Sequence, residues 1–201
     1  MNKVKICGLS RAEDIKTVNR LLPDYIGFVF AESRRRVDIN TAAKLKEKLN
    51  PQIVSVGVFV NEDIDIISEI YRAGIVEMVQ LHGDEDGEYI KRLKAVCGCP
   101  VIKAVGIGDV LPSLAAEPDY FLFDTLSEQR GGTGKTFDWN ILNDYRGLPY
   151  FLAGGLTTDN VIGTARLPGL FCVDVSSGVE TDGIKDAGKI EKFIYLHRRQ
   201  R

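Results

Sequence analysis

The sequence predicts a single α/β domain over residues 1–201 with a (β/α)8 fold, a closed barrel of parallel strands surrounded by helices (a TIM barrel). Short apolar runs alternate eight times with longer amphipathic segments. The strand runs are continuously apolar, which is typical of parallel sheets covered by helices. An open doubly wound sheet would show the same alternation, and 201 residues could also form two domains of about 100. The absence of a GxGxxG turn after the first strand favours the barrel.

The first half of the chain contains four predicted strand–helix units. The first strand begins at Val4, and Ser10 is predicted to cap the following helix with Glu13 as its capping-box partner. The strands are predicted at 4–7, 25–30, 54–60 and 78–81, and the helices at 11–21, 41–49, 64–72 and 88–96.

The second half repeats the pattern with less regular helices. Only 15 residues separate Ala104 from Tyr120, so the fifth helix is expected to be short or degenerate. The strands are predicted at 100–104, 120–123, 149–152 and 170–173, and the helices at 110–115, 139–145, 158–165 and 187–197.

Composition restricts the class of partner. Lysine and arginine total 26 against 28 aspartate and glutamate residues, so we expect no nucleic-acid partner. No apolar run is long enough for a membrane span and no signal peptide is visible, which indicates a cytoplasmic protein. The four cysteines fit a reducing compartment as free thiols, and with only two histidines we expect no metal site.

Polar residues follow six of the eight predicted strands, and a glycine-containing segment follows a seventh. The active site of such a barrel lies at the carboxyl ends of its strands, so these residues should converge at one end of the fold. They are Cys7-Gly8, Ser33 to Arg36, Asn61, His82 to Asp84, Asp124-Thr125, Ala153 to Leu156 and Asp174 to Gly178.

Glycines after the last two strands indicate a phosphate site. Gly154-Gly155 and Ser177-Gly178 occupy the two loops that commonly bind phosphate in these barrels. Their alternative role is simply to form turns. The glycine-rich segment 131–136 lacks the first glycine of a P-loop. It is read as a lid over the site, or as a surface loop.

Cys7, Asp124 and His82 are the candidates for proton transfer. Cys7 could instead be a small buried hydrophobic residue, and Asp124 a cap. His82 could be a base or could form hydrogen bonds at the rim. We expect Lys5 to point away from Cys7, which leaves the thiol without an evident cation.

In combination, these motifs resemble the phosphoribosylanthranilate isomerase family of tryptophan biosynthesis. The matching stretches run in order along nearly the whole chain and are specific as a set. They are Lys5 to Leu9, Gly27 to Phe30, Ser33 to Val37, Val56 to Asn61, Val79 to Asp84, Asp124-Thr125, Gly131 to Trp139, Ala153 to Leu156 and Val173 to Glu180.

The resemblance implies a (β/α)8 enzyme that catalyses an Amadori rearrangement of a phosphosugar without metal or cofactor. It implies that Asp124 is the general acid and Cys7 the general base. It assigns the anthranilate carboxylate to Arg35, although Arg36 could exchange roles with it. Asp174 and His82 are implied to bind substrate, and Gly154, Gly155, Ser177 and Gly178 the phosphate.

Two other functions remain open. The chain could be another phosphosugar barrel enzyme, of epimerase or aldolase type, for which Lys103 is the strand lysine that a Schiff base would need. It could also be a non-catalytic barrel, against which the presence of both Cys7 and Asp124 argues. We expect a monomer because no predicted helix has a conspicuously apolar outer face.

Overall fold

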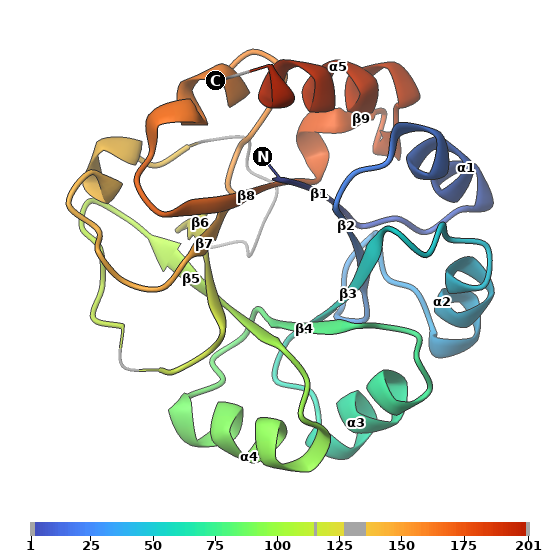
Figure 1. The fold of residues 1–201 in the computed structure, drawn as a ribbon. Coiled ribbons are helices and arrows are strands. Elements are labelled where there is room, and N and C mark those ends of the chain that lie inside the picture. The colour runs from blue at the N-terminus through green and yellow to red at the C-terminus, as the bar shows by residue number, and fades with distance from the viewer. Residues whose placement is uncertain (1–2, 115, 127–135, 200–201) are drawn as a thin grey trace.

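The computed structural model describes residues 3–114, 116–126 and 136–199. Within them, parallel strands close into a barrel in which each strand pairs with the next and β8 pairs with β1, as the sequence predicts (Figure 1). The strands are β1 (Lys3–Cys7), β2 (Tyr25–Val29), β3 (Val54–Phe59), β4 (Met78–Leu81), β5 (Val101–Ile107), β6 (Tyr120–Thr125), β7 (Tyr150–Leu152) and β8 (Leu170–Val175).

Helices surround the barrel unevenly. The α-helices are α1 (Ala12–Leu21), α2 (Ile39–Lys46), α3 (Ile64–Arg72), α4 (Gly87–Cys97) and α5 (Ala187–Arg198). On the flank of β5 to β7 the chain has loops and the short 3₁₀ helices η1 (Trp139–Leu142) and η2 (Val161–Arg166) (Figure 1). No helix occurs in 108–114 or 116–119, so the helix predicted at 110–115 is degenerate over the residues described.

The predicted cap of α1 is wrong. Arg11, not Ser10, is the N-cap residue, and Asp14 takes the role assigned to Glu13. The Asp14 carboxylate accepts hydrogen bonds from the backbone N–H groups of Ser10 and Arg11 and binds the Arg11 guanidinium. Asp14 is buried, so its charge must be satisfied locally, and these donors do so.

The interior of the barrel changes from apolar to polar along its axis. Side chains two residues apart on a strand share a face, so Met78, Gln80 and His82 all point inward from β4 and its end. Near the amino ends of the strands, Tyr25 packs edge-on against Phe151, and both are buried. One step toward the carboxyl ends, Gln80 is buried among polar neighbours. The apolar layer closes the bottom of the barrel, and the polar layer forms the floor of the site.

Candidate active site

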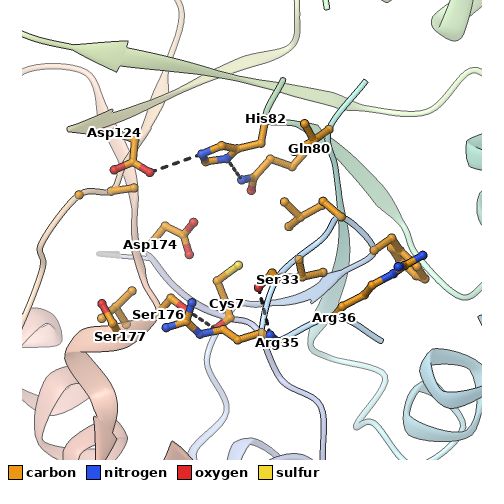
Figure 2. Close-up of a pocket in the computed structure, with 18 of the residues that line it drawn as sticks. Cys7, Ser33, Arg35, Arg36, Gln80, His82, Asp124, Asp174, Ser176 and Ser177 are labelled. Atoms are coloured by element: carbon orange, nitrogen blue, oxygen red, sulfur yellow. Dashed lines mark hydrogen bonds and ion pairs between the residues drawn. The ribbon is translucent and has the colours of Figure 1, made fainter. Parts of the chain in front are cut away.

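A cavity of about 440 Å³ opens at the carboxyl ends of the strands. Every predicted site residue except Gly178 lines it (Figure 2). These lining residues are Cys7, Arg35, His82, Asp124, Gly154, Gly155, Asp174 and Ser177. The folding of the barrel therefore brings together side chains from strands far apart in the sequence.

Lys5 lies beneath Cys7 and faces the same side of β1, so the expectation that it points away is wrong. Residues two apart on a strand share a face. The Lys5 side chain is fully buried, and its Nζ lies 2.8 Å from Asp174 Oδ2 and 2.9 Å from Gln80 Oε1. Its positive charge also lowers the pKa of the Cys7 thiol. Cys7 therefore does have a cation beside it.

The Cys7 thiol nevertheless has a raised pKa. Burial has the largest effect and raises the pKa of Cys7, and Asp174 adds to it, whereas Lys5 and Lys185 lower it. For Lys5 the balance is reversed. Burial disfavours its ammonium, but the charges of Asp174 and of an ionised Cys7 outweigh burial and raise the pKa of Lys5. Cys7 is therefore favoured as a neutral thiol and Lys5 as a charged ammonium.

Asp124 and His82 form a second group on another side of the cavity (Figure 2). Asp124 Oδ1 accepts the backbone N–H of Thr125 at 2.7 Å, and its Oδ2 lies 3.5 Å from His82 Nε2. The other ring nitrogen, His82 Nδ1, lies 2.9 Å from Gln80 Nε2. Gln80 thus links the two groups, since its amide oxygen accepts from Lys5.

Arg35 is held against Glu180 by two hydrogen bonds. Its Nε and Nη2 lie 2.7 Å and 2.9 Å from the two carboxylate oxygens. Arg34 binds the same carboxylate from an exposed position, and Arg36 pairs with the exposed Glu32 while also lining the cavity. Of the three arginines, Arg35 is the one whose guanidinium is both oriented and largely buried.

Glu180 and Lys185 belong to a small hairpin of β9 (Glu180–Thr181) and β10 (Ile184–Lys185). Lys185 Nζ lies 2.5 Å from Glu180 Oε1 and also donates to the backbone oxygen of Ser176. Burial alone would raise the pKa of Glu180, but Arg35 and Lys185 outweigh it and lower that pKa. For Lys185, burial outweighs Glu180 and lowers the pKa.

Sequence reasoning did not single out Glu180, Lys185 or Gln80 as site residues. Glu180 lies at the end of a stretch that matched the resembling family, which is a signal that could have found it. Gln80 is a polar residue inside the otherwise apolar strand Met78–Leu81. A buried amide needs hydrogen-bond partners, so its position alone pointed to a polar group inside the barrel.

The loops after β7 and β8 are packed closely by their glycines. Gly154 has φ of +82°, and a Cβ there would lie 2.4 Å from Thr125 Oγ1. A Cβ on Gly178 would lie 1.8 Å from the backbone oxygen of Leu156. Gly178 thus brings the short 3₁₀ helix η3 (Ser177–Val179) against the loop after β7 and does not line the cavity.

Three further expectations concern the rest of the chain. The segment expected to form a lid, 131–136, lies outside the described residues except for Thr136. Among the residues described, no three histidine, cysteine or acidic side chains are grouped as a metal site would require. In the same part of the chain, no helix combines the length and apolar character needed to cross a membrane.

Comparison with known proteins gives a consistent result. The family model for N-(5'phosphoribosyl)anthranilate (PRA) isomerase matches residues 4–195. The N-(5'-phosphoribosyl)anthranilate isomerase of Endomicrobium trichonymphae is 48% identical over 199 residues, covering 98% of this chain and 99% of that protein.

Solved structures agree. Phosphoribosyl anthranilate isomerase from Thermotoga maritima is 34% identical with a TM-score of 0.86, over 98% of this chain and 99% of that one. A phosphoribosyl anthranilate isomerase in complex with reduced 1-(o-carboxyphenylamino)-1-deoxyribulose 5-phosphate is 32% identical with a TM-score of 0.83, over the same shares. The chain therefore belongs to the N-(5'-phosphoribosyl)anthranilate isomerase family.

Proposed function

We propose that the protein converts N-(5-phosphoribosyl)anthranilate into 1-(2-carboxyphenylamino)-1-deoxyribulose 5-phosphate by general acid–base catalysis. Membership of the family supports the reaction, and one solved relative holds a reduced form of this product. The observation that carries the proposal is the presence of Cys7 and Asp124 on different sides of one cavity (Figure 2). A substrate between them would have one proton-transfer group at each reacting position.

The reaction needs two proton transfers. Asp124 donates a proton to the furanose ring oxygen, the C1–O bond breaks, and the nitrogen lone pair forms the C1=N⁺ bond of an iminium. Cys7 then removes the proton from C2, and the C–H electron pair forms an enolamine that tautomerises to the ketone. The iminium makes the C2 proton acidic, so a thiolate is a sufficient base.

The electrostatics of Cys7 suit a base that forms only when substrate is bound. Burial raises the pKa of Cys7. A cationic iminium beside the sulfur would favour the thiolate, as a nearby opposite charge does for any acid. Lys5 and Lys185 act in the same direction. Both proton transfers use side chains of this chain, so the scheme requires neither metal nor cofactor.

Arg35 is the proposed ligand of the anthranilate carboxylate. Its Nε and Nη2 are engaged by Glu180, so the Nη1 side of the guanidinium is left for the substrate. Arg36 lines the same cavity but is more exposed. A pre-oriented guanidinium binds a carboxylate with less loss of conformational freedom, which favours Arg35 over Arg36.

Asp174 and the two loops complete the proposed contacts. Asp174 Oδ2 accepts from Lys5, whereas its buried Oδ1 has no hydrogen-bond partner among the described residues. A buried acceptor of this kind is stabilised by a hydroxyl donor, and the sugar provides one. Gly154, Gly155 and Ser177 line the cavity where we place the phosphate, and Gly178 sets the spacing of that loop.

An aldolase using Lys103 is disfavoured by the contacts of that lysine. Lys103 Nζ lies 2.8 Å from Glu85 Oε2 and 2.7 Å from the backbone oxygen of Gly83. An ion-paired ammonium is a poor nucleophile because it must lose its proton before it can form a Schiff base. Lys103 is also absent from the lining of the cavity.

Turnover can be followed as the loss of phosphoribosylanthranilate fluorescence in the purified protein and in Cys7→Ser and Asp124→Asn variants. We expect each to lose about 10²- to 10⁴-fold in kcat, the usual contribution of general acid–base groups. Cys97→Ser and Asp144→Asn, which lie outside the cavity, serve as matched controls. Unchanged turnover in both site variants would overturn the mechanism, and no turnover in the parent would overturn the function.

The protein is further proposed to be a cytoplasmic monomer, with the phosphosugar as its small-molecule partner. The lack of a conspicuously apolar outer helix face in the sequence supports the monomer, and the charge balance supports a small-molecule partner over nucleic acid. Light scattering coupled to size exclusion measures the mass directly. A mass of twice the 22.3 kDa chain would contradict the monomer.

A further inference from the structure

We propose that Lys5 and Gln80 are positioning residues that fix the tautomer of His82, so that its ring proton is on Nε2 and faces Asp124. The effect on catalysis rests on the proposed function. The tautomer is a property of the free protein and can be measured without substrate.

The first step is the orientation of the Gln80 amide. Oxygen and nitrogen of an amide are distinguished by their hydrogen-bond partners. Lys5 Nζ lies 2.9 Å from Gln80 and 2.8 Å from Asp174, and its ammonium can only donate. The Gln80 atom that faces Lys5 must therefore be the acceptor Oε1. Turning the amide over would place its N–H₂ group against a buried ammonium.

The second step is the tautomer of His82. With Oε1 on Lys5, the N–H₂ group of Gln80 points at His82 Nδ1 over 2.9 Å. Nδ1 must accept this hydrogen bond, so it carries no proton, and the proton of the ring is on Nε2. Rotating the ring by half a turn would place carbon atoms at both contacts. The orientation found is the one that satisfies Gln80.

This tautomer directs the Nε2–H group of His82 toward Asp124. His82 Nε2 lies 3.5 Å from Asp124 Oδ2, and Asp124 Oδ1 is already engaged by the Thr125 N–H. His82 is thus placed to donate toward the carboxylate that remains after Asp124 has given up its proton. This assigns it a donor role rather than that of a base.

Lys5 also serves the other end of the cavity, because its ammonium has three N–H groups. Two of them are directed at Gln80 and Asp174, and the charge of the ammonium also acts on the Cys7 thiol. A substitution of Lys5 would disturb all three interactions, so it cannot separate them. Gln80 forms hydrogen bonds with Lys5 and His82 but none with Asp174 or Cys7 among the described residues, so it is the residue to change.

The test uses ¹H–¹⁵N correlation spectra of the substrate-free protein labelled with ¹⁵N-histidine, at about pH 8, where imidazole is uncharged in solution. The chain has two histidines, and a His82→Asn spectrum assigns their signals. We expect Nδ1 of His82 at the position of an unprotonated nitrogen and Nε2 at that of a protonated one. A proton on Nδ1 in the parent would overturn the proposal.

The decisive variant is Gln80→Glu, which has nearly the same shape but replaces the donor by an acceptor. Its carboxylate would still accept from Lys5 but would now accept from His82 Nδ1. We expect the Nδ1 signal to move to the protonated position, and the signals of His197, outside the cavity, to stay unchanged. Gln80→Met, which offers neither donor nor acceptor, should give a mixture. An unprotonated Nδ1 in Gln80→Glu would overturn the inference.

Kinetics separate this inference from the proposed function. Gln80→Glu is expected to lower kcat about tenfold, the effect of one lost hydrogen bond to a charged group, with KM little changed. Gln52→Glu, at an exposed turn, is the control. If Gln80→Glu inverts the tautomer of His82 but leaves kcat unchanged, the positioning role of Lys5 and Gln80 in catalysis is overturned. An inactive parent would refute the proposed function and leave the tautomer result standing.

Discussion

Replacing Glu180 by glutamine removes a carboxylate shared by three cations. The Glu180 side chain is 4% exposed and binds Arg35, Arg34 and Lys185. Glutamine keeps the size of the side chain but loses the charge and half of the acceptor capacity. The variant therefore tests how much this ion-pair cluster contributes to stability and to the orientation of Arg35.

The cost is dominated by Lys185, whose side chain is 3% exposed. Removing one partner of a buried ion pair costs about 3–5 kcal/mol. Burial already lowers the pKa of Lys185. Lys185 can therefore lose its proton when Glu180 is replaced, which limits the cost of leaving it unpaired, so we expect a loss of about 3 kcal/mol in the free energy of unfolding. Arg34 is 60% exposed and adds little. For a chain of this size, that corresponds to a fall in Tm of roughly 6–12 °C.

Urea unfolding at pH 7 of the parent, Glu180→Gln and Glu32→Gln measures this cost. Glu32 pairs with Arg36 but is 87% exposed, so the same substitution should cost less than about 1 kcal/mol there. Glu180→Gln should also raise KM, because Arg35 loses its two fixed hydrogen bonds. Equal stability losses in the two variants would refute the reasoning.

Three further predictions concern Gly178, His197 and Cys7. In Gly178→Ala the new Cβ would lie 1.8 Å from the Leu156 backbone oxygen, so the loop would have to move. We expect KM to rise about tenfold or more, because the loss of one hydrogen bond to the phosphate has an effect of that size. Gly108→Ala, which makes only ordinary contact, should leave KM unchanged, and equal KM values would contradict the idea. Burial lowers the pKa of His197 from 6.5 to about 4. The free energy of unfolding that His197 contributes above pH 6.5 is therefore lost as the pH falls toward 4, by at most about 2 kcal/mol at pH 5. Urea unfolding at pH 7 and pH 5 should show a smaller loss of stability in His197→Phe than in the parent. Because burial raises the pKa of Cys7 and a base must be deprotonated, kcat/KM should still rise with pH at pH 8. A plateau already reached at pH 7 would count against Cys7 as the base.

Features that depend on local pattern could be predicted from the sequence. The helix at 64–72 and the strand at 78–81 agree residue for residue with the structure, because apolar periodicity reflects the face that each element buries. Cys7, Asp124 and Asp174 follow or end apolar strand runs, and active-site residues of such barrels lie at the carboxyl ends of the strands, so the sequence predicts that they lie at one end of the fold. The roles assigned to them remain predictions.

Features that depend on contacts between distant segments could not be predicted from the sequence. Glu13 and Asp14 both suit the first turn of a helix, and only the folded structure shows that Asp14 is buried and accepts from the backbone N–H groups. Glu180 gains its importance from Arg35, 145 positions away in the chain. The close approach of Gly178 to Leu156 likewise exists only once the two loops are packed together.

The sequence by itself determined the alternation of strands and helices and the set of polar residues that end the strands, and it favoured a barrel over an open sheet. Those features follow from periodicity and from the polar residues that end each strand, which are local properties. The tertiary structure alone decided that Lys5 joins Asp174 and reaches His82 through Gln80. The physical reason is that hydrogen bonds and charge effects inside a barrel depend on distances between strands, which the order of residues along one strand does not contain.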